Sequence, residues 1–72
     1  MDDRPMTANE AQIHLQDLHL ERALADVEGL ASDPLYMADL EEEITATRHA
    51  YVGAAVTEIA TLRAELSGPQ VG

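Results

Sequence analysis

Gly29-Leu30-Ala31-Ser32-Asp33-Pro34 is the stretch that decides the fold of this 72-residue chain. Glycine is favoured where a helix ends in the left-handed backbone conformation, because it has no Cβ atom to clash there. Ser32 or Asp33 can cap a following helix, and Pro34 suits its first turn, where the missing proline N–H would have been unpaired anyway. The stretch therefore predicts two helices joined by a tight turn, and so short a connection makes them antiparallel neighbours.

The bounds of the two helices follow from signals on either side of this turn. Thr7-Ala8-Asn9-Glu10 fits a capping box, in which the threonine hydroxyl and the glutamate carboxylate each accept a hydrogen bond from a backbone N–H. The first helix is therefore predicted over about 8–30. Beyond Pro34 the chain has no proline until Pro69, so the second helix is predicted over about 34–67.

The two helices differ in length, which leaves part of the longer one uncovered. At a rise of about 1.5 Å per residue, the helices are about 33 Å and 50 Å long. Folded back from the turn, the first helix reaches only about residue 57 of the second. Three large apolar residues lie beyond that point: Ile59, Leu62 and Leu66. We expect residues 1–72 to form one helical-hairpin unit with disordered ends at 1–5 and 69–72.

Apolar residues at helical spacing indicate the face that each helix buries. The main stripe of the first helix consists of Ile13, Leu20, Leu24 and Val27. A weaker stripe on its opposite side consists of Ala11, Leu15, Leu18 and Ala25. The second helix carries a long stripe of mostly large residues: Met37, Leu40, Ile44, Tyr51, Ala55, Ile59, Leu62 and Leu66. The main stripe and the long stripe are therefore predicted to form the core of the hairpin.

A line of small residues follows the side of the second helix nearly opposite its large stripe. Its members are spaced alternately four and three residues apart, as in a helix–helix seam: Ala46, Ala50, Gly53, Thr57, Ala60 and Ala64. Alanine is also the best helix former, so the line can equally be read as a solvent-facing side. A glycine inside a helix costs about 0.5–1 kcal/mol relative to alanine, and Gly53 therefore favours the seam.

Self-association explains the small-residue line and the uncovered end of the second helix together. A chain this short has little room for a core, and it has no cysteine, phenylalanine or tryptophan. We predict that two hairpins dimerise into a four-helix bundle, mainly through the second helix. The residues predicted for self-association are Ala46, Ala50, Gly53, Thr57, Ile59, Ala60, Leu62, Ala64 and Leu66.

The net charge of −10 is concentrated in one part of the chain. Residues 1–43 hold twelve of the fourteen acidic residues and two arginines, whereas residues 44–72 have a net charge of zero. Seven of these acids lie between Asp26 and Glu43, a run that contains no basic residue, and in the folded hairpin these seven gather around the turn. A basic partner could dock there, and the residues predicted for it are Asp39, Glu41, Glu42 and Glu43. The alternative is a solvated face, in which only the acids close to the start of the second helix gain from its dipole.

No arrangement of residues predicts an enzyme. A row of one histidine and three carboxylates follows one side of the first helix: Glu10, His14, Asp17 and Glu21. The Glu-x-x-His pair of di-iron bundles is missing, because the residues three before His14 and His49 are alanines. A row of hydrated and salt-bridged surface residues is the simpler interpretation. We therefore predict no catalytic residue, no metal ligand and no cofactor.

The same features set the expected class of function and location. A polyanion repels nucleic acid and anionic lipid, no apolar run reaches the length of a membrane span, and the N-terminus lacks a secretory pattern. We expect a cytoplasmic protein, and twelve alanines with arginine as the only basic residue favour a bacterial or phage genome. The predicted function is a non-enzymatic protein-interaction module, a small acidic dimeric regulator or inhibitor of another protein. The alternatives are a DNA mimic that inhibits a nucleic-acid-binding protein, and a structural component that assembles into a larger homo-oligomer.

Overall fold

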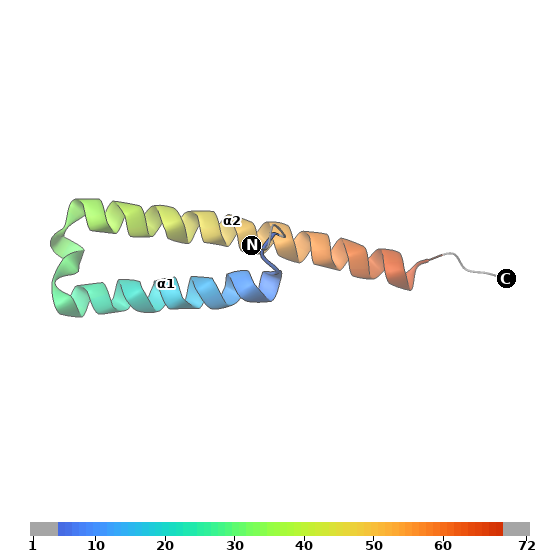
Figure 1. The fold of residues 1–72 in the computed structure, drawn as a ribbon, viewed down its shortest axis with the longest axis horizontal. Helices are drawn as coiled ribbons and strands as arrows, with labels where there is room; N and C mark the ends of the chain where they lie inside the picture. The colour runs from blue at the N-terminus through green and yellow to red at the C-terminus, as the bar shows by residue number, and fades with distance from the viewer. Residues whose placement is uncertain (1–4, 69–72) are drawn as a thin grey trace.

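A computed structural model describes residues 5–68 as two α-helices that pack against each other in an antiparallel hairpin (Figure 1). Helix α1 spans Ala8–Glu28, a short 3-10 helix η1 spans Leu30–Ser32, and helix α2 spans Pro34–Leu66. The prediction of an all-helical hairpin is confirmed for this part of the chain. Apart from Pro5, the ends predicted to be disordered lie outside the described residues.

The start of α1 is fixed by its own cap and by a contact with α2. The Thr7 N–H donates to Oε1 of Glu10 at 2.9 Å, and the Glu10 N–H donates to Oγ1 of Thr7 at 3.1 Å, which confirms the capping box. The Ala8 N–H donates to Oε2 of Glu58 at 2.6 Å. Helix α1 therefore covers α2 from the turn to about residue 57, as predicted, and the rest of α2 projects beyond the start of α1 (Figure 1).

The turn differs in one detail from its prediction. Gly29 takes φ +80°, the left-handed conformation predicted for it, and α1 ends directly before it at Glu28, two residues short of the predicted bound near residue 30. The next three residues form η1, in which the Ser32 hydroxyl donates to the Gly29 carbonyl at 2.9 Å. The Asp33 carboxylate then caps α2 by accepting hydrogen bonds from the Leu35 and Tyr36 N–H groups at 3.1 and 3.2 Å.

The core uses the weaker stripe of α1, so the predicted core face of this helix is wrong. Leu18 packs with Leu40 and Ile44 of α2 in a small buried cluster. Ala11 and Ala25 are also buried, one on each side of Leu18 along the helix. The main stripe of the sequence pattern is exposed instead: Ile13, Leu20, Leu24 and Val27. On α2 the long stripe is half-buried or buried from Met37 to Ala55, together with Thr47, and its last three members are exposed.

Size and polar contacts explain why α1 turns its weaker stripe toward α2. Alanines at both ends of the buried face let the two helix backbones approach closely, with Leu18 filling the space between them. The polar residues beside this face reach partners on α2: Arg22 pairs with Glu41, and Tyr36 donates to Glu21. Rotating α1 about its own axis to bury its larger residues would break these two contacts.

The hairpin is far from compact for its mass. It exposes 5774 Å², whereas a globular protein of this mass exposes about 4,400 Å². Its radius of gyration is 17.5 Å, against about 11 Å for a compact domain of this length. Among residues 5–68, five apolar side chains are buried, and only Leu18, Leu40 and Ile44 are larger than alanine. The core is therefore small and one-sided.

Two leucines with opposite environments test this core directly. Leu18 is 3% exposed and Leu35 is 77% exposed. We expect Leu18→Ala to lower the free energy of unfolding by about 2–4 kcal/mol or to abolish the helical fold, because it empties the centre of the cluster. Leu35→Ala should change it by less than about 0.5 kcal/mol. Urea titration followed by circular dichroism at 222 nm measures both, and equal effects of the two substitutions would contradict the assigned core.

Candidate functional site

The largest unpartnered surface of α1 is the stripe that points away from α2. We call it the outer face of α1, and it consists of Ile13, Leu20, Leu24 and Val27, with exposed fractions from 47 to 83%. Isolated exposed leucines are ordinary on protein surfaces, but a contiguous apolar strip on a helix is a typical interaction surface. The sequence pattern identified these residues as a group that must be buried, and the structure shows that α2 does not bury them.

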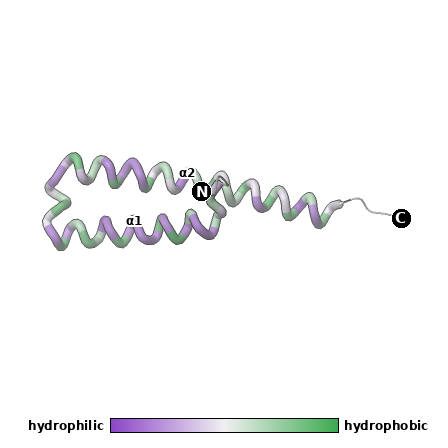
Figure 2. Tube along the Cα trace, in the orientation of Figure 1, coloured by the Kyte–Doolittle hydropathy of each residue, from purple (hydrophilic) through white to green (hydrophobic). Residues whose placement is uncertain are grey.

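The second half of α2 also exposes large apolar residues. Val52, Val56 and Ile59 lie three or four residues apart, and we call them the distal face of α2. Leu62 and Leu66 continue the apolar surface on the end that projects past α1, where Figure 2 shows hydrophobic positions with no second helix beside them. The exposure of residues 59–66 agrees with the prediction from helix length. Val52 and Val56 were not among the residues predicted for self-association, although their helical spacing from Ile59 places all three on one face of α2.

The small-residue line lies on the surface of the hairpin. All six members are exposed: Ala46, Ala50, Gly53, Thr57, Ala60 and Ala64. A Cβ atom built on Gly53 would meet no heavy atom within 4 Å, so no contact among residues 5–68 requires glycine there. The line is therefore available for a close helix contact, and its role in self-association stays a prediction.

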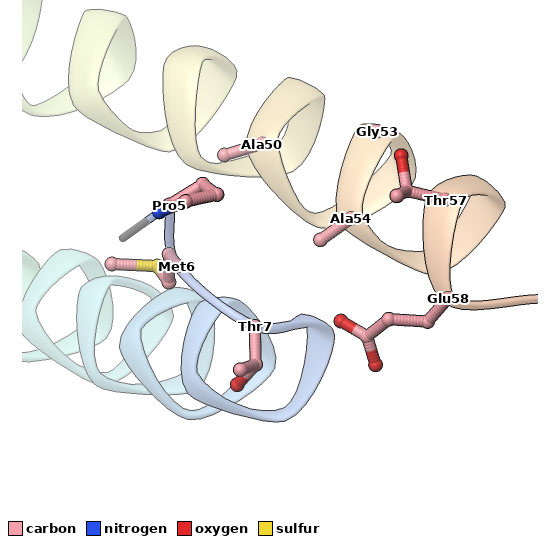
Figure 3. A pocket seen from close by; sticks show the side chains of 8 residues that line it. All are labelled: Pro5, Met6, Thr7, Ala50, Gly53, Ala54, Thr57 and Glu58. Carbon is pink, nitrogen blue, oxygen red and sulfur yellow. The ribbon is translucent and has the colours of Figure 1, made fainter. Parts of the chain in front are cut away.

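Part of this line borders a hollow beside the start of α1. Pro5 and Met6 lie along one side of the hollow and α2 contributes the other, as Figure 3 shows. The hollow has a volume of about 460 Å³, and its lining from α2 consists of Ala50, Gly53, Ala54, Thr57 and Glu58. Small side chains on α2 create this space, because larger ones would fill it. Its walls are mainly apolar, apart from the Glu58 carboxylate that holds the Ala8 N–H.

The acidic end, residues 26–43, is less free of cations than the sequence suggests. Arg22 precedes this run in the chain, yet its Nη2 lies 2.9 Å from Oε1 of Glu41 across the helix pair. His14 Nε2 lies 3.8 Å from Oε2 of Glu43. The run of three glutamates contains no basic residue in the sequence, but antiparallel packing brings α1 alongside the run and places an arginine next to it.

The other two residues predicted for a basic partner remain unpaired within the described part of the chain. Asp39 and Glu42 are exposed and have no ion pair or hydrogen bond from residues 5–68. Asp39 borders a shallow hollow with Glu21, Tyr36 and Glu43. Three of those four residues are carboxylates, so one side of the hairpin is strongly negative near the turn.

The tyrosine in this acidic surrounding is held in its neutral form. The Tyr36 hydroxyl donates to Oε2 of Glu21 at 2.6 Å. This hydrogen bond, together with desolvation and the negative charges of Glu21 and Glu28, raises the pKa of the Tyr36 phenol above its ordinary value. The phenol therefore acts as a hydrogen-bond donor that links the two helices next to the turn.

The row of Glu10, His14, Asp17 and Glu21 does not converge on a common point. Glu10 caps α1, His14 approaches Glu43, and Glu21 accepts from a tyrosine. Within residues 5–68 no three carboxylate or histidine side chains are grouped closely enough to hold a metal ion. The hollow beside α1, the exposed helix faces and the acidic end are the surface features from which we argue a function.

A comparison with protein families, curated proteins and solved structures finds no match for this chain. Neither α1 nor α2 is long and apolar enough to cross a membrane, over the residues that the structure describes.

Gly53 offers a clean test of the small-residue line. A Cβ atom at this position meets no described heavy atom within 4 Å, and the rest of a leucine side chain can enter the hollow beside Pro5 and Met6, so Gly53→Leu should leave the hairpin folded. If a second helix packs closely on the line, the added side chain keeps it away and the mass in solution falls from a dimer to a monomer. Gly53→Ala is the matched control, which keeps a small residue and strengthens α2 by about 0.5–1 kcal/mol. Light scattering that shows the same mass for both variants and the natural chain would exclude the line from self-association.

Proposed function

We propose that this protein is a non-enzymatic protein-interaction module. It associates with a second copy of itself through α2, in a four-helix bundle, and regulates or inhibits another protein that presents a basic surface. The self-association supplies the buried area that a single hairpin lacks. The acidic end and the surfaces next to it supply the charge that selects the partner.

The observation that carries this proposal is the ratio of exposed to buried apolar residues. Twelve large apolar side chains are exposed among the described residues, against three that are buried. Two separate hairpins expose twice 5774 Å², whereas a compact protein of twice the mass exposes about 7,300 Å². The difference is an upper bound of about 4,300 Å² of surface that association can bury, within the range of about 2,000–5,000 Å² for obligate homodimers.

Charge favours one orientation of the two copies. The acids are concentrated in residues 1–43, so a parallel pair would bring two acidic ends together. An antiparallel pair joined along the length of α2 places them at opposite ends of the dimer. Residues 44–72 carry Arg48 and Arg63 as well as Glu58 and Glu65, and their net charge of zero allows two copies to approach.

A larger homo-oligomer is the second candidate, favoured by the position of the apolar surfaces. The outer face of α1 and the distal face of α2 lie on different helices and are not related to each other by symmetry. A contact between unlike surfaces does not close on itself unless the rotation permits it, and can therefore add further copies. A mass above that of a dimer, rising with concentration, would favour this assembly over the regulator.

A single charge reversal tests the role of the acidic end. Glu42→Lys changes an unpaired carboxylate on this end, and Glu65→Lys makes the same change in net charge near the far end of α2. We expect Glu42→Lys to reduce capture of the basic partner from an extract of the producing cells at least tenfold, and Glu65→Lys to leave capture within twofold. Capture should weaken as salt rises, because exposed charges are screened.

The same assay separates the proposal from its alternatives. If double-stranded DNA displaces the captured protein, the chain is a DNA mimic. A captured protein that DNA does not displace supports the regulator with its own docking surface. Equal loss of capture in the two variants would show that net charge alone, and not the acidic end, is responsible.

A further inference from the structure

We propose that the outer face of α1 binds an amphipathic helix of another protein, one with lysine or arginine beside its apolar side. This inference rests on the proposed function and names both the docking surface and the kind of partner. It extends the partner site from the acidic end onto a face of α1 that the sequence pattern had placed in the core. The proposed contact through α2 leaves this face of α1 uncovered.

The shape of the outer face suits a helical ligand. Leu20, Leu24 and Val27 are spaced by four and three residues, and Ile13 lies two turns before Leu20. This is the spacing of a helix seam, and it continues over 15 residues of α1, or about 21 Å. An apolar strip of that length matches four turns of a second helix, which presents anchors at the same intervals.

The charges beside the strip decide the chemistry of the partner. Asp17 and Glu28 flank the outer face on one edge, both exposed and without an ion pair from residues 5–68. The same edge continues into the side of the hairpin where Glu21, Asp39 and Glu43 line a shallow hollow. The opposite edge carries uncharged residues, among them Gln12, Gln16 and Ala23. A helix with basic side chains along one flank would place them against the acidic edge.

The same charges argue against a second copy of α1 as the occupant. In an antiparallel pair of identical helices, a two-fold axis brings like edges together. The acidic edge of one copy would then lie beside the acidic edge of the other, and carboxylates such as Asp17 would repel one another. In a parallel pair the two acidic ends would meet instead. A basic helix from a different protein has neither disadvantage.

A synthetic peptide provides a defined probe. An 18-residue amphipathic helix of leucine and lysine presents one apolar side and basic flanks, and its counterpart with glutamate in place of lysine is the charge control. We expect the lysine peptide to bind and to shift the backbone NMR signals of Ile13, Leu20, Leu24 and Val27. The glutamate peptide should bind at least tenfold more weakly.

Matched variants assign the binding to the outer face. Leu20→Asp should weaken the peptide at least tenfold, whereas Leu35→Asp makes the same chemical change at an exposed leucine of α2 and should alter affinity less than twofold. Asp17→Lys, which leaves the apolar strip intact, should also weaken binding and reduce its dependence on salt. Circular dichroism checks that each variant keeps its helices.

The outcomes separate this inference from the proposed self-association. Equal effects of Leu20→Asp and Leu35→Asp, or signal shifts centred on α2, would overturn the assignment to the outer face. A natural chain that has the mass of a dimer but does not bind the lysine peptide would overturn this inference alone. A chain that binds the peptide on α1 but remains a monomer would overturn the self-association and leave the docking surface standing.

Discussion

The contact of Leu18 with Leu40 and Ile44 is the interaction on which the whole hairpin depends. It is the only place among the described residues where large apolar side chains from both helices are buried together. Ala11 and Ala25 bring the backbones close on either side of it, and the polar contacts of Arg22 and Tyr36 hold the same face of α1 toward α2. Because this contact fixes the rotation of α1, it also fixes which apolar residues are left outside.

The interaction surfaces are a direct consequence of that rotation and of the unequal helix lengths. One side of α1 is used in the core, and the opposite side, which carries the larger apolar residues, faces outward. The turn at Gly29 and the hydrogen bond between Ala8 and Glu58 set where α1 begins and ends along α2. The remaining turns of α2 therefore project without cover. Chains of this size without disulfides or metals commonly depend on oligomerisation for their stability.

The secondary structure could be predicted closely, because its signals are local. The capping box at Thr7 and the proline that opens α2 act within a few residues, and both helices start where these signals place them. Helix α1 ends two residues earlier than expected, because Gly29 directly after Glu28 takes the left-handed conformation. The reach of α1 along α2 followed from helix length alone, and the exposure of Ile59, Leu62 and Leu66 agreed with it.

The rotation of α1 could not be predicted from hydropathy. Two apolar stripes of α1 can face α2, and the sequence pattern favoured the stripe with the larger residues, which include Ile13 and Leu20. The outcome depends on contacts between residues far apart in the chain, such as Arg22 with Glu41 and His14 with Glu43. The same contacts alter the charge expected at the acidic end. No basic residue lies next to its glutamates in the sequence, but Arg22 of α1 pairs with Glu41 in the structure. Self-association and partner binding depend on a second molecule and stay predictions.

We propose that a single hairpin is incomplete and that a second copy completes it. Unfolding in urea, measured by circular dichroism over a hundredfold range of chain concentration, tests this claim most directly. If folding and dimerisation are coupled, the free energy of unfolding rises by about 2.8 kcal/mol over that range and the urea midpoint moves upward with it. A midpoint that is independent of chain concentration would contradict the account, because it would show that one hairpin is stable alone.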